Sequence, residues 1–75
     1  MYTKSQFGKE LEEELELKYD IVTLSRWAFQ KYTDNREFED GLSKEIMKIV
    51  AMEEGPEFEY TKEELHELAL KLQKK

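Results

Sequence analysis

Two segments with the same pattern of residues mark helix starts near the beginning and the end of the chain. Residues 2–7 read Tyr-Thr-Lys-Ser-Gln-Phe, and residues 60–65 read Tyr-Thr-Lys-Glu-Glu-Leu. In each, the threonine hydroxyl can accept a hydrogen bond from the first helical turn. The Gln or Glu three residues later can accept one from the threonine N–H. The flanking apolar residues occupy hydrophobic-staple positions. This pattern predicts helices that begin near residues 3 and 61.

The spacing of apolar residues predicts an all-α fold of four short helices in a compact, bundle-like array. The first helix has an apolar residue at every fourth position from Phe7 to Tyr19. Asp20 is a suitable N-cap for a second helix from Ile21 to about Tyr32. The last helix should run from Lys62 to about Gln73.

The start of the third helix has two interpretations. Asp34 followed by Glu37 is a variant of the same capping pattern and predicts a helix that contains Phe38 and Gly41. Alternatively, Asp40 caps a shorter helix that starts near Gly41. Gly55-Pro56 should end this helix, because glycine can adopt the left-handed conformation and proline cannot continue a helix. Residues 57–60 are then an extended connector.

A single domain of residues 1–75 is expected from the length of the chain. Its predicted core combines the apolar positions of all four helices. These are Phe7, Leu11, Leu15, Leu24, Ala28, Phe38, Leu42, Ile46, Ile49, Leu65, Leu68 and Leu72.

Composition favours a cytoplasmic protein and disfavours several function classes. There are no cysteines, which excludes disulfides and thiolate metal sites. The chain begins with polar residues rather than a signal peptide, and no apolar run is long enough to cross a membrane. Its 18 acidic and 12 basic residues give a net charge of −6, which opposes nucleic-acid binding. The acidic residues cluster in segments 10–16 and 53–67.

No arrangement of residues in the sequence predicts catalysis, a metal site or a cofactor site. His66 is the only histidine, and the nearby Glu63 and Glu67 do not complete a metal-ligand set. The serines have no base close in sequence, and the three glycines do not form a phosphate-binding loop. We therefore expect a protein that is not an enzyme.

The second helix has a wider apolar arc than a peripheral helix needs. One interpretation is a central helix packed on several sides. The other is that part of the arc, most plausibly Trp27 or Phe29 beside Arg26, is exposed to a partner, since Trp, Tyr and Arg are enriched at interface hot spots. The acidic residues Glu57, Glu59, Glu63 and Glu67, near aromatic residues of the connector, extend this candidate partner-binding set.

Two family resemblances accompany these patterns. The segment from Asp40-Gly41-Leu42 to Met52-Glu53-Glu54 is similar in rhythm to acyl carrier proteins, although Gly41 stands where that family carries its phosphopantetheine-bearing serine. Tyr2-Thr3, Phe7 and the acidic first helix resemble the opening of small bacteriocin immunity proteins. That resemblance implies an acidic four-helix inhibitor of a basic nuclease toxin.

The sequence thus predicts a non-enzymatic, acidic helical protein that binds another protein. A basic toxin or nucleic-acid-binding protein, inhibited in the manner of an immunity protein or antitoxin, is the expected partner class. One alternative is a structural homodimer without a separate ligand. The other is a small DNA-binding regulator that uses helices two and three as a helix-turn-helix. Neither a membrane nor a nucleic acid is an expected partner under the main hypothesis.

Overall fold

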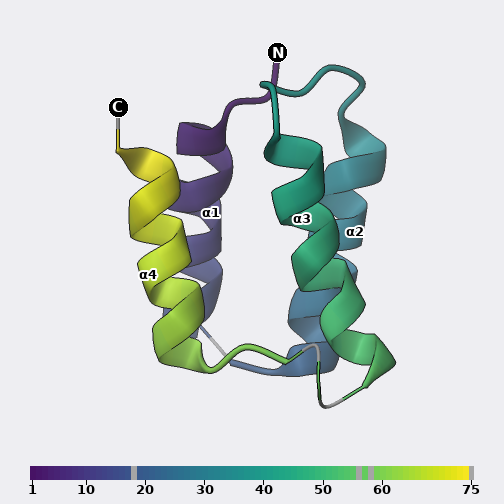
Figure 1. The fold of residues 1–75 in the computed structure, drawn as a ribbon, viewed down its shortest axis with the longest axis vertical. Coiled ribbons are helices and arrows are strands. Elements are labelled where there is room, and N and C mark those ends of the chain that lie inside the picture. Colours follow the sequence, from purple (N-terminus) through teal and green to yellow (C-terminus); the bar gives the residue numbers. More distant parts are fainter. Residues whose placement is uncertain (18, 56, 58, 75) are drawn as a thin grey trace.

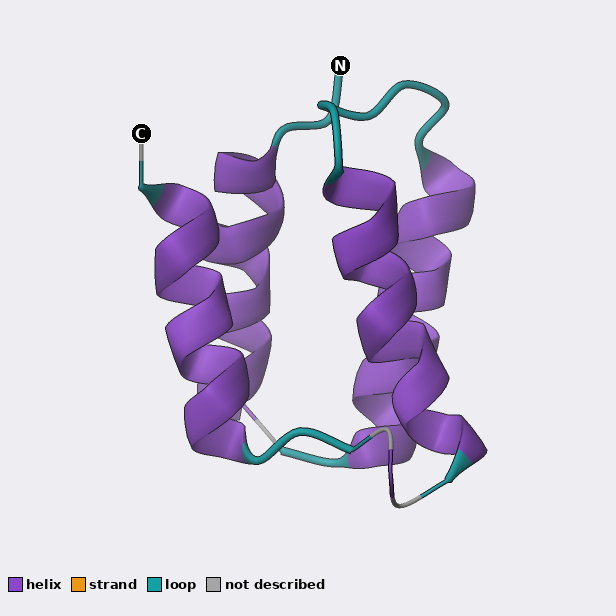
Figure 2. Ribbon diagram, viewed as in Figure 1, coloured by secondary structure: helices purple, strands orange, loops and turns teal. Residues whose placement is uncertain are grey.

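Four α-helices run alternately up and down in a computed structural model that describes residues 1–17, 19–55, 57 and 59–74 (Figure 1). They are α1 (Lys4–Leu17), α2 (Ile21–Asp34), α3 (Leu42–Val50) and α4 (Lys62–Gln73), and a short 3₁₀ helix, η1 (Ala51–Glu54), follows α3. No strand occurs among the described residues (Figure 2). The predicted all-α class is confirmed.

Both predicted capping patterns form as expected. Thr61 Oγ1 accepts from the Glu64 N–H at 3.1 Å, and Glu64 Oε1 accepts from the Thr61 N–H at 2.9 Å. The same pair of hydrogen bonds joins Thr3 and Gln6, at 3.1 and 2.9 Å. Two backbone N–H groups are satisfied at each helix start, so these local patterns fix where α1 and α4 begin.

Asp20 also caps α2 as predicted, accepting a hydrogen bond from the Val22 N–H at 3.3 Å. This helix continues to Asp34, two residues beyond the expected end near Tyr32.

The longer version of the third helix is wrong. Asp34 belongs to α2, and α3 begins only at Leu42, close to the alternative start near Gly41. Gly41 rather than Asp40 is the N-cap residue, with a left-handed φ of 85° that glycine adopts without steric cost. The intervening residues leave the helical conformation and cross the end of the bundle.

Pairing with the N-terminal segment explains why residues 37–39 are not helical. The Tyr2 N–H donates to the Glu37 carbonyl at 2.9 Å, and the Glu39 N–H donates to the Tyr2 carbonyl at 2.8 Å. Phe38 therefore lies in an isolated parallel β-bridge with Tyr2, not on the apolar face of α3. The carboxylate of Glu39 then accepts from the Lys4 N–H at 2.7 Å, at the start of α1.

The third α-helix ends at Val50, earlier than the predicted boundary at Gly55, and the chain continues as η1 to Glu54. The conformation of Gly55 also differs from expectation. The Gly55 φ of 171° is extended rather than left-handed. The predicted boundary also depended on Pro56, and the predicted connector contains Phe58. Both residues lie outside the described residues.

The helices pack as two antiparallel pairs, α1 with α4 and α2 with α3, around one shared core (Figure 1). Ten of the twelve predicted core residues are buried, while Phe38 and Leu68 are partly buried. Tyr2, Met52 and Ala69 are additional core residues. None of the helices in the described part of the chain combines the length and hydrophobicity needed to span a bilayer.

Gly8 marks the closest approach of α1 to α4. A Cβ atom built on Gly8 would lie 2.6 Å from the Ala69 backbone oxygen and 3.0 Å from the Leu72 Cβ. The missing side chain therefore allows the two helix backbones to pack closely.

Candidate functional site

One face of α2 carries apolar side chains that remain exposed. Val22, Ser25, Phe29 and Tyr32 share this face because they are spaced by three or four residues. Ser25 is only 1% exposed, and its hydroxyl donates to the Val50 carbonyl at 2.6 Å, so the face borders the end of α3. Val22, Phe29 and Tyr32 are nevertheless 43%, 51% and 38% exposed. Helix α2 is thus packed on α3 without being covered on this side.

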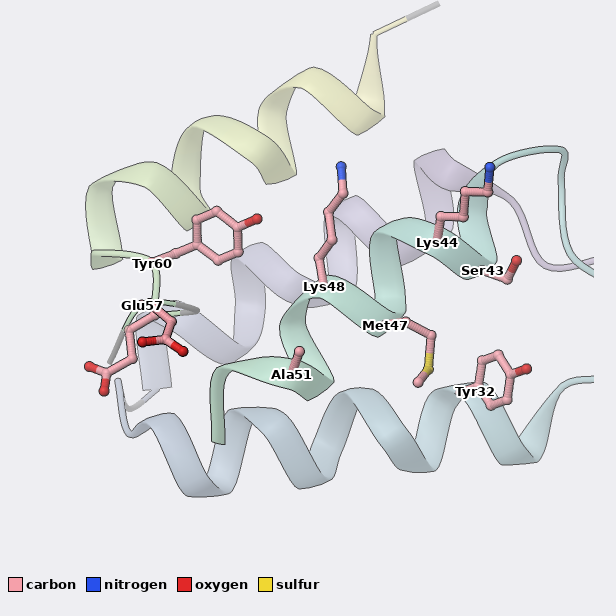
Figure 3. A pocket seen from close by; sticks show the side chains of 9 residues that line it. Tyr32, Ser43, Lys44, Met47, Lys48, Ala51, Glu57 and Tyr60 are labelled. Carbon is pink, nitrogen blue, oxygen red and sulfur yellow. The ribbon is translucent and has the colours of Figure 1, made fainter. Parts of the chain in front are cut away.

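A groove of about 630 Å³ lies between the outer surfaces of α2 and α3, and we call it the α2–α3 groove. Its lining residues come from α2, from α3 with η1, and from the connector before α4. They are Tyr32, Ser43, Lys44, Met47, Lys48, Ala51, Glu57, Glu59 and Tyr60. Figure 3 shows Met47 pointing from α3 toward α2 in the middle of this groove.

Charges of opposite sign stand at the two ends of the α2–α3 groove. Lys44 lies at the end that contains Tyr32, and Glu57 lies at the opposite end with Tyr60 (Figure 3). Lys48, in the last turn of α3, forms a 3.3 Å ion pair with Glu45 on the same helix. That pair is exposed and therefore contributes little to stability. The groove thus has an apolar middle, a basic end and an acidic end.

Tyr19 fixes the acidic end of the groove to the rest of the protein. Its hydroxyl donates to the Tyr60 carbonyl, which ties the segment before α2 to the connector before α4. Burial raises the pKa of Tyr19, and the negative charges of Glu59 and Glu64 raise it further. The neutral phenol is therefore favoured and can act as the donor of this hydrogen bond.

Trp27 lies away from this face. Residues two apart on a helix point about 160° away from each other, so Trp27 and Phe29 are on nearly opposite sides of α2. The Trp27 ring is partly buried and stacks on Phe7, with 5.4 Å between centroids and 20° between planes. Arg26 is exposed and shares the side of Phe29. The structure therefore groups Arg26 with Phe29 but not with Trp27.

The four predicted glutamates divide into two sets. Glu57 and Glu59 line the α2–α3 groove, whereas Glu63 and Glu67 lie with His66 in a shallow hollow on the outside of α4. Within the described residues, these four carboxylates form neither an ion pair nor a hydrogen bond. Residues 1–17, 19–55, 57 and 59–74 contain no group of three or more His, Asp or Glu side chains that could hold a metal ion.

Two carboxylates of the earlier acidic segment, residues 10–16, have hydrogen-bond or ion-pair partners within the protein. Glu10 accepts a hydrogen bond from the Tyr2 hydroxyl and forms a 3.5 Å ion pair with Lys31. Glu12 accepts from the Gln73 amide at 2.8 Å. These carboxylates hold the N-terminal segment, α2 and α4 against α1, so part of the first cluster has a structural role.

Sequence reasoning did not include Met47, Tyr32, Lys44 or Lys48 in the candidate site. Met47 lies off the buried stripe of α3, and an exposed methionine in a helix is too common to indicate a site by itself. Only the packing of α3 beside α2 brings Met47 and Tyr32 into one groove. No protein-family model, curated protein or solved structure gave a significant match to this chain.

Proposed function

We propose that this protein acts without catalysis, by binding a basic protein partner through the uncompensated glutamates of the connector and α4. The observation that carries this proposal is that Glu57, Glu59, Glu63 and Glu67, which have no hydrogen bond or ion pair among the described residues, line two hollows of the surface. All four are exposed. Their negative charge is therefore available to another molecule rather than used within the fold.

A hollow between α3 and α4 lies between the two sets of glutamates, and Lys48 and Lys71 also line it. It is lined by Tyr60, which also lines the α2–α3 groove, and by Glu67, which also lines the hollow outside α4. A tyrosine ring beside carboxylates provides apolar contact area within a charged rim, as interfaces commonly do. On α2, Phe29 and Arg26 supply an exposed aromatic residue and a guanidinium, while Trp27 belongs with the core.

A basic toxin or nucleic-acid-binding protein fits this surface by charge, and inhibition of such a partner is the function we favour. A net charge of −6 accelerates encounter with a cationic protein and slows encounter with nucleic acid. The DNA-binding alternative also lacks geometric support. In a helix-turn-helix, the helices cross at about 90–120° through a turn of about 3–4 residues. Here α2 and α3 run antiparallel, connected by residues 35–41.

Affinity capture from a lysate, followed by mass spectrometry, would identify candidate partners. The association rate of a purified candidate is then measured at several salt concentrations. Replacing all four of Glu57, Glu59, Glu63 and Glu67 by Gln should slow association and flatten its salt dependence. Attraction between these carboxylates and a basic partner speeds encounter, and salt screens that attraction over about 8–10 Å at physiological ionic strength. Helix content by circular dichroism should stay the same.

A matched control removes the same amount of charge elsewhere. Substituting Glu13, Glu14, Glu16 and Glu37 with Gln neutralises four carboxylates that make no hydrogen bond or ion pair in the described part of the chain. This variant should keep most of the association rate. A partner whose association is indifferent to salt and to both sets of substitutions would rule out recognition by the acidic surface.

A further inference from the structure

The α2–α3 face concentrates the exposed apolar surface of the molecule. Seven large hydrophobic side chains are exposed in the described residues, and four of them lie on this face: Val22, Phe29, Tyr32 and Met47. The remaining three are scattered over the N-terminal residue, the end of α1 and α4. Tyr32 and Met47 line the α2–α3 groove, and Val22 and Phe29 share the face of Tyr32 on α2. A strip of exposed apolar side chains on one face is characteristic of an interaction surface, whereas isolated exposed apolar residues are ordinary.

The charges around this strip identify a specific occupant. The α2–α3 groove places Lys44 and Lys48 along α3 and places Glu57 and Glu59 on the connector. A purely basic partner would leave the lysines opposite like charges, and a purely acidic partner would do so at the glutamates. A complementary occupant must carry acidic and basic groups in the reverse order along its length.

A second copy of this chain satisfies that requirement. The twofold axis would lie in the plane between the two copies and cross the groove near Met47, at right angles to the length of the groove. Rotation by 180° about this axis reverses the order of the charges. We propose that two copies associate through this face as a symmetric dimer. Lys44 of each copy then faces the glutamates of the other, and Met47 lies at the apolar centre.

The apolar contact must provide most of the free energy of this association. Two copies of net charge −6 repel each other at long range, so the local charge pairs determine the register and exclude parallel or shifted arrangements. This inference goes beyond the proposed function, because it concerns a different occupant, and the two occupants would compete for Glu57 and Glu59. Glu63 and Glu67 lie on α4, outside the α2–α3 groove, and remain exposed in such a dimer.

Charge reversal provides a test that needs no other protein. One variant combines Lys44→Glu with Lys48→Glu, and a second combines Glu57→Lys with Glu59→Lys. Each variant alone places like charges opposite each other at both ends of the interface. An equimolar mixture restores opposite charges at both ends, because the reversed groups of one variant face the reversed groups of the other and the unchanged groups face the unchanged groups. Sedimentation velocity of each variant and of the mixture gives the association state.

We expect the wild-type protein to dimerise and each variant to dissociate at least about tenfold more readily. The mixture should recover the wild-type dissociation constant as a heterodimer. Met47→Glu should dissociate the dimer by placing a charge at its apolar centre, with helix content unchanged by circular dichroism. Trp27 emission should not change on dilution, since this ring stacks on Phe7 away from the interface.

A control pair reverses two lysines outside the groove. Lys71→Glu combined with Lys74→Glu changes the net charge as much as the α3 variant does and should leave dimerisation nearly unchanged. A wild-type protein that stays monomeric at millimolar concentration would overturn the inference. So would a mixture of the two variants that associates no better than either alone. Both outcomes leave the acidic-surface proposal intact, because that proposal is measured with a basic partner.

Discussion

Gly8→Ala tests whether the close approach of α1 to α4 depends on the absence of a side chain. Ordinary van der Waals contact begins near 3.4 Å and the new Cβ would lie 2.6 Å from the Ala69 oxygen, a shortfall of about 0.8 Å. The clashing atom belongs to the backbone, so α4 itself must move. Alanine gains about 1 kcal/mol in helix propensity over glycine, whereas overpacking costs about 1–3 kcal/mol. We expect a net destabilisation of about 1 kcal/mol.

Urea denaturation followed by circular dichroism and Trp27 fluorescence measures this change in the free energy of unfolding. A loss of about 1 kcal/mol corresponds to a decrease in Tm of about 4–8 °C for a domain of this size. Glu13→Gly and Glu13→Ala form the control pair, because they compare the same two residues at an exposed position of α1. If Gly8→Ala stabilises the protein as much as alanine stabilises it over glycine at position 13, the proposed close packing is refuted.

The remaining predictions concern single hydrogen bonds. Thr61→Ala should lower the free energy of unfolding by about 1 kcal/mol, and Thr3→Ala by less because the N-terminal turn can fray; equal, negligible losses in urea denaturation would contradict both. Ser25→Ala should cost about 1–3 kcal/mol in the same assay, since the partly buried Val50 carbonyl loses its 2.6 Å donor, and a neutral effect would argue that this contact is weak. Burial, with a neighbouring carboxylate, raises the pKa of Tyr2 above its ordinary value of 10.0. Above pH 10 the unfolded chain therefore loses this proton first, so stability should fall as pH rises, and Tyr2→Phe should reduce that fall in alkaline denaturation.

Local interactions made the helix starts predictable from the sequence. The hydrogen bonds of Thr61 and Asp20 involve residues two or three positions away, so the residue types and spacing contain all the necessary information. The apolar stripes of α1 and α4 likewise depend only on helical periodicity. These features gave the fold class, and most core residues followed from them.

Long-range pairing made the segment between α2 and α3 harder to predict. Glu37 follows Asp34 at a spacing typical of a capping box, but the Tyr2 backbone binds residues 37 and 39 instead. Nothing near Phe38 in the sequence indicates that its partner is Tyr2, in the segment before α1. The α2–α3 groove was missed for the same reason, since its residues come from separate elements and meet only after packing.

The pairing of α1 with α4 has a consequence for the order of folding. These helices are the first and last along the chain, while α2 and α3 form a hairpin joined by residues 35–41. Closing a longer loop costs more conformational entropy, so we expect the hairpin to form early and the docking of α1 on α4 to complete the fold. Both chain ends lie at the same end of the bundle (Figure 1). A circular permutant that joins them by a short linker and opens the connector before α4 would make α1 and α4 a local hairpin. It should fold faster than the natural order in stopped-flow refolding.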